Sequence, residues 1–128
     1  MKKLYSLILV SIFFVTGCQT SSNENINVSM ISLIANPEKY DNKMVTVIGV
    51  GNLEFEGNKV CLSKNDLDYH ISGNCFWLEL SEETPYEEAK NLNGKYVIIE
   101  GTFDVKNKGH FGRYSGTITN ITRYENWE

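Results

Sequence analysis

The stretch that decides the fold reads Met44-Val45-Thr46-Val47-Ile48-Gly49-Val50-Gly51-Asn52-Leu53-Glu54-Phe55-Glu56. It is rich in β-branched and aromatic residues, and its alternating apolar positions, which include Leu53 and Phe55, predict one long strand with those side chains facing a core. Gly49 and Gly51 lie in its middle, where glycine permits a bulge or a sharp bend. A long strand that bends can pair with different neighbours at its two ends, as the first strand of a small barrel must.

The rest of the chain supplies further short strands and a few helical segments. The predicted strands are 59–63, 75–80, 95–105 and 115–123, and the predicted helical segments are 28–35, 64–71 and 81–92. Asn27 is expected to cap the first helix, and Asn36-Pro37 to end it, because the residue before proline is disfavoured in a helix. Trp127 in the short tail is expected to pack against the strands.

This order of elements is a helix, three strands, a helical connector and two strands. It is the order of the OB fold, a five-stranded Greek-key barrel, with one helix added in front. We therefore predict a mainly β domain, a small OB-like barrel whose preceding helix closes one open end. A small β-sandwich is the main alternative, because turn signals every ten or so residues fit it as well.

The first residues have the pattern of an export signal. Met1-Lys2-Lys3 is basic, residues 4–15 form an apolar run too short for a comfortable membrane span, and Val15-Thr16-Gly17-Cys18 resembles the lipobox of bacterial lipoproteins. We predict a signal peptide at 1–17 and lipidation of Cys18. The alternative is an ordinary secretory signal with a chance cysteine.

The expected location is the bacterial cell envelope, with the domain held to a membrane by its N-terminal lipid. Residues 18–26 are polar and predict a flexible tether, which leaves 27–128 as the barrel domain. Gln19 rather than Asp after the cysteine favours the outer membrane, facing the periplasm, if the organism is Gram-negative. Loss of Lys2 and Lys3 with the leader moves the net charge from −4 to about −6, which argues against nucleic acid as a partner.

Two cysteines remain after lipidation, Cys61 and Cys75. They fall in the second and third predicted strands, which should be neighbours, and disulfides persist in an exported compartment. The spacing is not that of a C-x-x-C redox or metal site. A structural disulfide is favoured, and two buried free thiols or redox or metal chemistry stay open as alternatives.

The loop 106–116 is the most unusual stretch, because it gathers positive charge and aromatic rings in an acidic domain. In an OB fold it lies between the fourth and fifth strands, beside the loop at Gly57-Asn58-Lys59, and these two loops flank the usual ligand groove. The predicted ligand-binding residues are Lys108, His110, Phe111, Arg113 and Tyr114. The alternative is a hairpin loop in which glycines provide the turn and His110 hydrogen-bonds locally.

Other combinations of polar residues carry weaker signals. Glu54 and Glu56 alternate on one strand, which is more often a solvated edge than an acid–base pair. Asp66, Asp68 and His70 include metal-ligand residue types, but a helix N-cap with a solvated face explains them better. No catalytic residue, cofactor or metal site is predicted, since phosphate-loop, H-E-x-x-H and G-x-S-x-G motifs are missing.

Residues 28–124 resemble a family of uncharacterised bacterial OB-fold-like lipoproteins. The resemblance is carried by segments 35–41, 53–58, 62–64, 100–103 and 109–112, with Ser115-Gly116. It implies the fold and no activity. Cys61 and Cys75 stand where relatives are expected to have plain apolar residues, and such a paired departure favours a disulfide.

The function expected from these observations is a non-catalytic binding module of the envelope for a small ligand, a glycan fragment or a partner protein. The alternatives are a structural or inhibitory protein that docks on a larger envelope complex and, more weakly, an enzyme that uses His110. Fold alone does not decide among these functions.

Overall fold

A computed structural model describes residue 17 and residues 24–128. Residues 1–16 and 18–23, which include most of the predicted leader and tether and the predicted lipidation site Cys18, lie outside the described residues. Within them the elements follow in this order: β1 Ile26–Asn27, α1 Met30–Ala35, η1 Pro37–Tyr40, β2 Met44–Asn52, β3 Lys59–Cys61, α2 Lys64–Asp68, η2 Ser72–Asn74, β4 Cys75–Leu78, α3 Tyr86–Lys90, β5 Tyr96–Asp104, η3 His110–Gly112 and β6 Thr117–Asn126.

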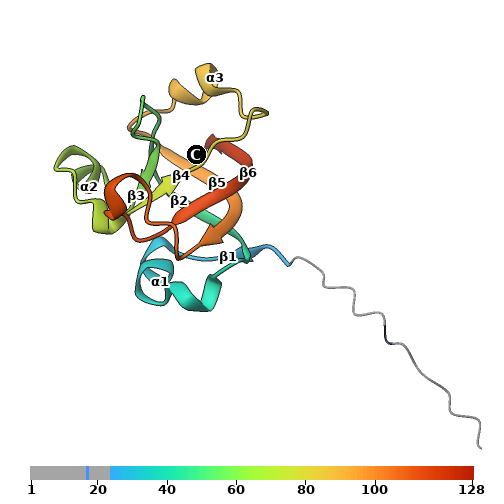
Figure 1. The fold of residues 1–128 in the computed structure, drawn as a ribbon. Coiled ribbons are helices and arrows are strands. Elements are labelled where there is room, and N and C mark those ends of the chain that lie inside the picture. Colours follow the sequence, from blue (N-terminus) through green and yellow to red (C-terminus); the bar gives the residue numbers. More distant parts are fainter. Residues whose placement is uncertain (1–16, 18–23) are drawn as a thin grey trace, which may run out of the picture.

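The strands close into a barrel (Figure 1). In the described part of the chain the sheet order is β1-β2-β3-β4-β6-β5, and a further pairing of β2 with β5 completes the ring. The β4–β6 pairing is parallel, whereas β2–β3, β3–β4, β2–β5 and β5–β6 are antiparallel. This is a five-stranded, OB-like barrel with β1 as an additional strand, so the predicted fold is confirmed and the sandwich is rejected.

Strand β2 has the two sets of neighbours that its length and glycines predicted. One edge pairs with β5 from Met44 to Val50, and the other carries β1 at Val45 and Thr46 and β3 from Val50 to Asn52. A short β2 could not reach all three partners, so its length is what allows the sheet to close.

The prediction that this strand continues to Glu56 was wrong. The strand ends at Asn52, because the side-chain amide of Asn93 hydrogen-bonds to both backbone groups of Leu53. Its oxygen accepts from the Leu53 N–H at 2.7 Å, and its nitrogen donates to the Leu53 carbonyl at 2.9 Å. The chain then turns, with the Gly57 N–H donating to the Glu54 carbonyl. Leu53 is buried as expected, but Phe55 is 90% exposed and does not face the core.

Gly51 is where the barrel wall must come close to another side chain. A Cβ at Gly51 would collide with the hydroxyl oxygen of Tyr124 and lie 2.8 Å from Cγ2 of Val97. Burial raises the pKa of Tyr124, and its hydroxyl makes no hydrogen bond to any described residue. Glycine at this position therefore lets a large ring from β6 pack against β2.

The core fills the barrel interior. On β5 the side chains of Val97, Ile99 and Phe103 are fully buried, so alternate residues of this strand face the core, as the pleat requires. The rings of Phe76 and Phe103 meet edge to face with centroids 5.4 Å apart, a favourable arrangement of two aromatic side chains.

Helices lie at opposite ends of the barrel, α1 at one and α3 at the other (Figure 1). Met30 and Leu33 of α1 and Ala89 of α3 belong to the same buried cluster as the strand residues. A helix before the barrel was predicted correctly, but its cap was not. Helix α1 starts at Met30 and is capped by Ser29, whose hydroxyl accepts from the Ser32 N–H at 3.1 Å.

Asn27, the predicted cap, instead pairs with Thr46 in β1. Its neighbour Ile26 pairs there too, although the sequence placed it at the end of the tether. Because this pairing requires an extended backbone, the helix cannot begin before Ser29, which caps it. Among residue 17 and residues 24–128, no helix has the length and apolar character needed to cross a bilayer.

Candidate functional site

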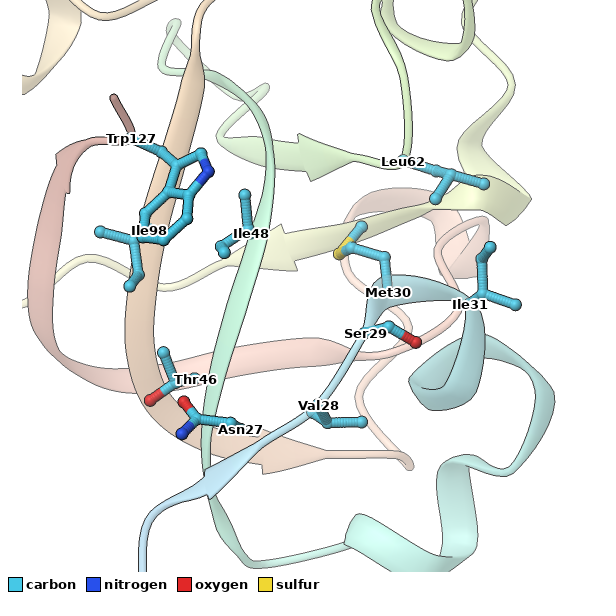
Figure 2. Close-up of a pocket in the computed structure, with 10 residues that line it drawn as sticks. All are labelled: Asn27, Val28, Ser29, Met30, Ile31, Thr46, Ile48, Leu62, Ile98 and Trp127. Carbon is cyan, nitrogen blue, oxygen red and sulfur yellow. The ribbon is translucent and has the colours of Figure 1, made fainter.

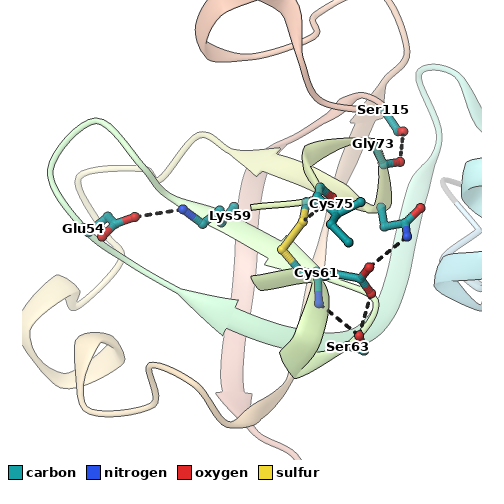
Figure 3. Close-up of a disulfide and its surroundings, with 10 residues drawn as sticks. Glu54, Lys59, Cys61, Ser63, Gly73, Cys75 and Ser115 are labelled. Atoms are coloured by element: carbon teal, nitrogen blue, oxygen red, sulfur yellow. Dashed lines mark hydrogen bonds and ion pairs between the residues drawn. A yellow bond between two sulfur atoms is a disulfide. The ribbon is translucent and has the colours of Figure 1, made fainter. Parts of the chain in front are cut away.

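Cys61 and Cys75 form a disulfide, with an S–S distance of 2.05 Å (Figure 3). They are register partners on β3 and β4, as are Val60 and Phe76 beside them. Since Val60 and Phe76 are buried in the barrel core, the pleat turns the two sulfur atoms to the outer face of this sheet. The disulfide prediction is confirmed, and the free-thiol alternative is excluded.

This outer face, which carries the ligand in many OB folds, is covered by the protein itself. Val50, Leu67 of α2 and both cysteines form a second buried cluster, with Tyr114 packed against it. The disulfide is almost completely inaccessible, since the two cysteines are 0% and 1% exposed. A ligand could reach this part of the face only if α2 moved away.

Asp66 fastens α2 in that position. Its carboxylate accepts from the Ser63 hydroxyl at 2.6 Å and from the Asn74 amide at 2.9 Å, while the Ser63 hydroxyl accepts from the Asp66 N–H. These hydrogen bonds lower the pKa of Asp66, and the one from Ser63 has the largest effect. Asp68 instead pairs with Lys64 at 2.8 Å, so the N-cap interpretation of this segment is the correct one.

Metal ligation finds no support in the described residues, because no three His, Cys, Asp or Glu side chains among them come close enough together to hold an ion.

The predicted ligand-binding loop folds over Trp77 of β4. The His110 ring stacks on Trp77 at 6.1 Å between centroids, and the Tyr114 ring meets Trp77 edge-on at 5.3 Å. Phe111 packs edge-on against His110 at 4.0 Å, and Arg113 lies over the Phe111 ring at 5.4 Å. The structure therefore brings four of the five predicted residues together, but they contact one another and Trp77.

The remaining predicted residue, Lys108, donates to the Ser115 carbonyl at 3.2 Å. Gly109 has φ of +64°, and a Cβ there would lie 2.6 Å from Cβ of Trp77, so the glycine is needed for the loop to pack. Phe111 also has positive φ, at 56°, and is 77% exposed. The loop forms a compact knob with an exposed ring, and none of its five predicted residues lines either hollow described next.

The first hollow is polar and lies between the β2–β3 turn and α2. It holds about 390 Å³ and includes the ion pair of Lys59 with Glu54, whose nitrogen and oxygen are 2.8 Å apart. The Lys59 side chain is only 10% exposed, and its hydrogen bond lowers the pKa of Glu54. A carboxylate engaged in this way stabilises the turn between β2 and β3.

The second hollow, an apolar pocket of about 610 Å³, lies on the outer face of β2 and β5 (Figure 2). It is lined by Asn27, Val28, Ser29, Met30, Ile31, Thr46, Ile48, Leu62, Ile98 and Trp127. Helix α1 and strand β1 form one wall, and Trp127 and Ile98 form the opposite wall. Its volume and apolar lining are typical of sites for small molecules.

Trp127 is placed here because the end of the chain continues along β5. The Trp127 N–H donates to the Tyr96 carbonyl at 2.9 Å, which extends the β5–β6 pairing past Asn126. The indole remains 50% exposed at the pocket. The predicted packing of Trp127 against the barrel is therefore correct, and the residue also shapes a pocket that the sequence did not predict.

Among the residues that the structure describes, no charged side chain lines the apolar pocket. Two of its three polar side chains are already engaged, since Thr46 donates to Asn25 at 2.8 Å and Ser29 to Ser32 at 3.0 Å. A ligand that enters it must therefore bury a neutral, mainly apolar surface, because an ion placed there would have no partner.

A signal for this pocket does exist in the sequence. The runs 45–48 and 97–99 are almost uninterruptedly apolar, and such runs are typical of strands that are covered on both faces. Ile48 and Ile98 are the outward members of these runs and are register partners in β2 and β5. The sequence-based prediction considered only the residues that face the core, and it therefore missed these two outward-facing side chains.

A comparison with protein-family models finds no match, and comparisons with curated proteins and with solved structures find none either. The resemblance to OB-fold-like lipoproteins therefore stays a prediction from the sequence.

Proposed function

We propose that this protein is a non-catalytic binding module of the bacterial envelope, anchored by lipid at Cys18, which holds a small neutral apolar ligand in the pocket beside Trp127. The observation that carries the proposal is the pocket itself, which measures about 610 Å³, is open to solvent and has no charged side chain among its described lining residues. The largest well-formed apolar pocket with a few polar groups is the default binding site of an uncharacterised domain.

The pocket supports this function better than the loop 106–116 does. The rings of His110 and Tyr114 are engaged with Trp77, and Arg113 lies over Phe111. In the pocket, by contrast, Ile31, Ile48 and Trp127 keep 65%, 37% and 50% of their surface exposed. Phe111 is 77% exposed as well, but it lines neither hollow. Exposed apolar side chains that line one hollow can be buried together by a single ligand, and that burial favours binding.

The test is binding of the neutral, environment-sensitive dye Nile red to the mature domain, followed by its fluorescence. Replacing Trp127 by Ala should weaken binding by about tenfold or more, because the ligand loses a large apolar contact. The matched control is Phe111→Ala, which removes an exposed aromatic side chain from the other candidate site and should leave binding unchanged. Loss of binding in Phe111→Ala alone would transfer the site to the loop.

The anchor is supported by the lipobox-like residues 15–18 alone. In cells, Cys18→Ala should move the protein from the membrane fraction to the soluble fraction, while the wild-type protein stays with the membrane. Unchanged membrane retention of the variant would reject lipidation at this cysteine.

A further inference from the structure

The backbone of β2 shows which of its residues face which edge. The Gly51 N–H donates to the Lys95 carbonyl at 3.1 Å, and the Lys43 carbonyl accepts from Phe103 at 2.9 Å. Register with β5 runs without a shift from Met44 to Val50. Because successive residues of a strand direct their N–H and C=O groups to opposite edges, the odd-numbered residues face β5 and the even-numbered residues face the other edge.

That other edge is covered at both ends and open between them. The Thr46 carbonyl accepts from Val28 at 3.0 Å, beside β1, and Val50 pairs with Cys61 of β3. Ile48 lies between these two registers. In the part of the chain that the structure describes, neither its N–H nor its C=O has a hydrogen-bond partner on this edge.

Neither neighbouring strand can extend to cover Ile48. After β1 the chain turns into α1, which Ser29 caps. After β3 the Leu62 N–H turns to the Asn74 carbonyl at 3.0 Å, and Ser63 caps α2. The opening in the sheet is therefore fixed by two helix starts and is one residue long.

The apolar pocket lies over this opening. Ile48 lines it together with Val28 and Leu62, the residues that directly follow β1 and β3 (Figure 2). A ligand that displaces water from the pocket leaves the backbone groups of Ile48 without a partner, which is costly unless the ligand supplies one. A purely apolar ligand cannot do so.

We infer that the ligand carries one amino-acid residue with an amide on each side, beside its apolar groups, as peptides and N-acylaminoacyl amides do. The C=O of that residue accepts from the Ile48 N–H and its N–H donates to the Ile48 carbonyl, the pairing by which an extended peptide adds to the edge of a sheet. The two groups belong to successive amides, because the C=O and N–H of one trans amide point in opposite directions. The length of the opening limits this pairing to one residue. The inference rests on the proposed function, since it concerns the same pocket.

The test compares three matched ligands that displace Nile red: the hexylamide of N-octanoylglycine, its sarcosine analogue, which lacks the glycine N–H, and the analogue in which an ester replaces that amide. The glycine compound should bind about 3- to 10-fold tighter than the other two, the effect of one hydrogen bond. Water hydrates the glycine compound best of the three, so apolar burial alone would give the opposite order. Equal or weaker binding of the glycine compound overturns the inference and leaves the proposed function standing. Failure of all three ligands and of Nile red overturns the proposed function itself.

Hydrogen exchange at single residues gives an independent readout. In the free protein the Ile48 amide should exchange faster than those of Val47 and Gly49, which face β5. The hexylamide of N-octanoylglycine should slow exchange at Ile48 selectively, and no slowing there would overturn the inference. The peptide acetyl-Leu-Val-Leu-amide distinguishes the two sources of the paired residue: binding identifies peptides as ligands, and binding of the N-octanoylglycine compound alone identifies N-acylaminoacyl amides.

Discussion

The barrel has two outer faces that differ in what covers them. The face of β3 and β4 is closed by α2, by the loop over Trp77 and by the Cys61–Cys75 disulfide. The face of β2 and β5 is flanked by α1 and Trp127, which leave a pocket of about 610 Å³ between them. The first face is built for stability and the second has space for a ligand.

This difference shows that the position of a binding site does not follow from the fold. An OB barrel offers its β3–β4 face to ligands in many proteins, yet in this chain that face is occupied by the protein's own side chains. Covering one face with a disulfide and a helix leaves the opposite face available. The predictions below test whether stability and binding are separated in this way.

The largest effect is expected from the disulfide. Replacing Cys61 and Cys75 together by Ala should lower the free energy of unfolding by about 3 kcal/mol, because the unfolded chain is no longer cross-linked. Urea denaturation measures this loss, and reduction of the wild-type protein should reproduce it. Nile red binding to the folded variant should be unchanged. A loss below about 0.5 kcal/mol would show that the closed face does not depend on the cross-link.

The next largest loss of stability is expected from removing the Asp66 hydrogen bonds that hold α2 in place. Asp66→Ala should cost about 1–3 kcal/mol, because it leaves the Asn74 amide and the Ser63 hydroxyl without their acceptor. The matched control is Asp68→Ala on the same helix. Asp68 forms an exposed ion pair with Lys64, so its loss should cost only about 0.3–0.5 kcal/mol in the same urea experiment. Equal costs for the two variants would contradict the role given to Asp66.

Acid should weaken the same hydrogen bonds, because it protonates the Asp66 carboxylate. The pKa of Asp66 is lowered in the folded protein, so its stabilising contribution is complete above the ordinary carboxyl pKa of 3.8 and is lost as the pH falls through the lower folded value. Glu54, whose pKa Lys59 lowers, acts in the same direction. The free energy of unfolding, measured from about pH 5 to about pH 2, should fall less steeply in Asp66→Ala than in wild type. Parallel profiles would contradict this assignment.

The smallest effect is expected at the exposed ring of the loop. Phe111 has φ of 56°, which glycine adopts more easily, so Phe111→Gly should change stability by between zero and a gain of about 1 kcal/mol. Phe55→Gly is the control: Phe55 is also exposed but lacks positive φ, so glycine should cost about 0.5 kcal/mol there. Neither change should alter Nile red binding, and loss of binding in either variant would contradict the separation of the two faces.

Local sequence patterns predicted the barrel well. The β-branched run with two glycines identified β2, and the strand predicted at 95–105 contains β5. The end of β2 at Asn52 was not predictable, because it depends on Asn93, which lies 40 positions away. The exposure of Phe55 follows from the same distant contact, since the turn that the contact begins directs this side chain to solvent.

The binding site was harder to predict than the fold. The loop 106–116 has a conspicuous composition, but its rings are used in packing on Trp77. The pocket has an inconspicuous composition and is assembled from β1, α1, β2, β5 and the chain end. The apolar runs 45–48 and 97–99 indicate that this face is covered, but only the three-dimensional closure of the barrel brings Asn27 and Trp127 to the same place, so the runs alone do not locate the site.

The meeting of these two residues has a practical consequence for anyone who handles the protein. Asn27 lies in β1 and Trp127 directly follows β6, yet both line the pocket. A purification tag appended shortly after Trp127 starts close to the indole, and a short tag directly before residue 26 starts next to the opposite wall. Screening should therefore use tag-free material, or attachment through an engineered cysteine on α3 at the far end of the barrel.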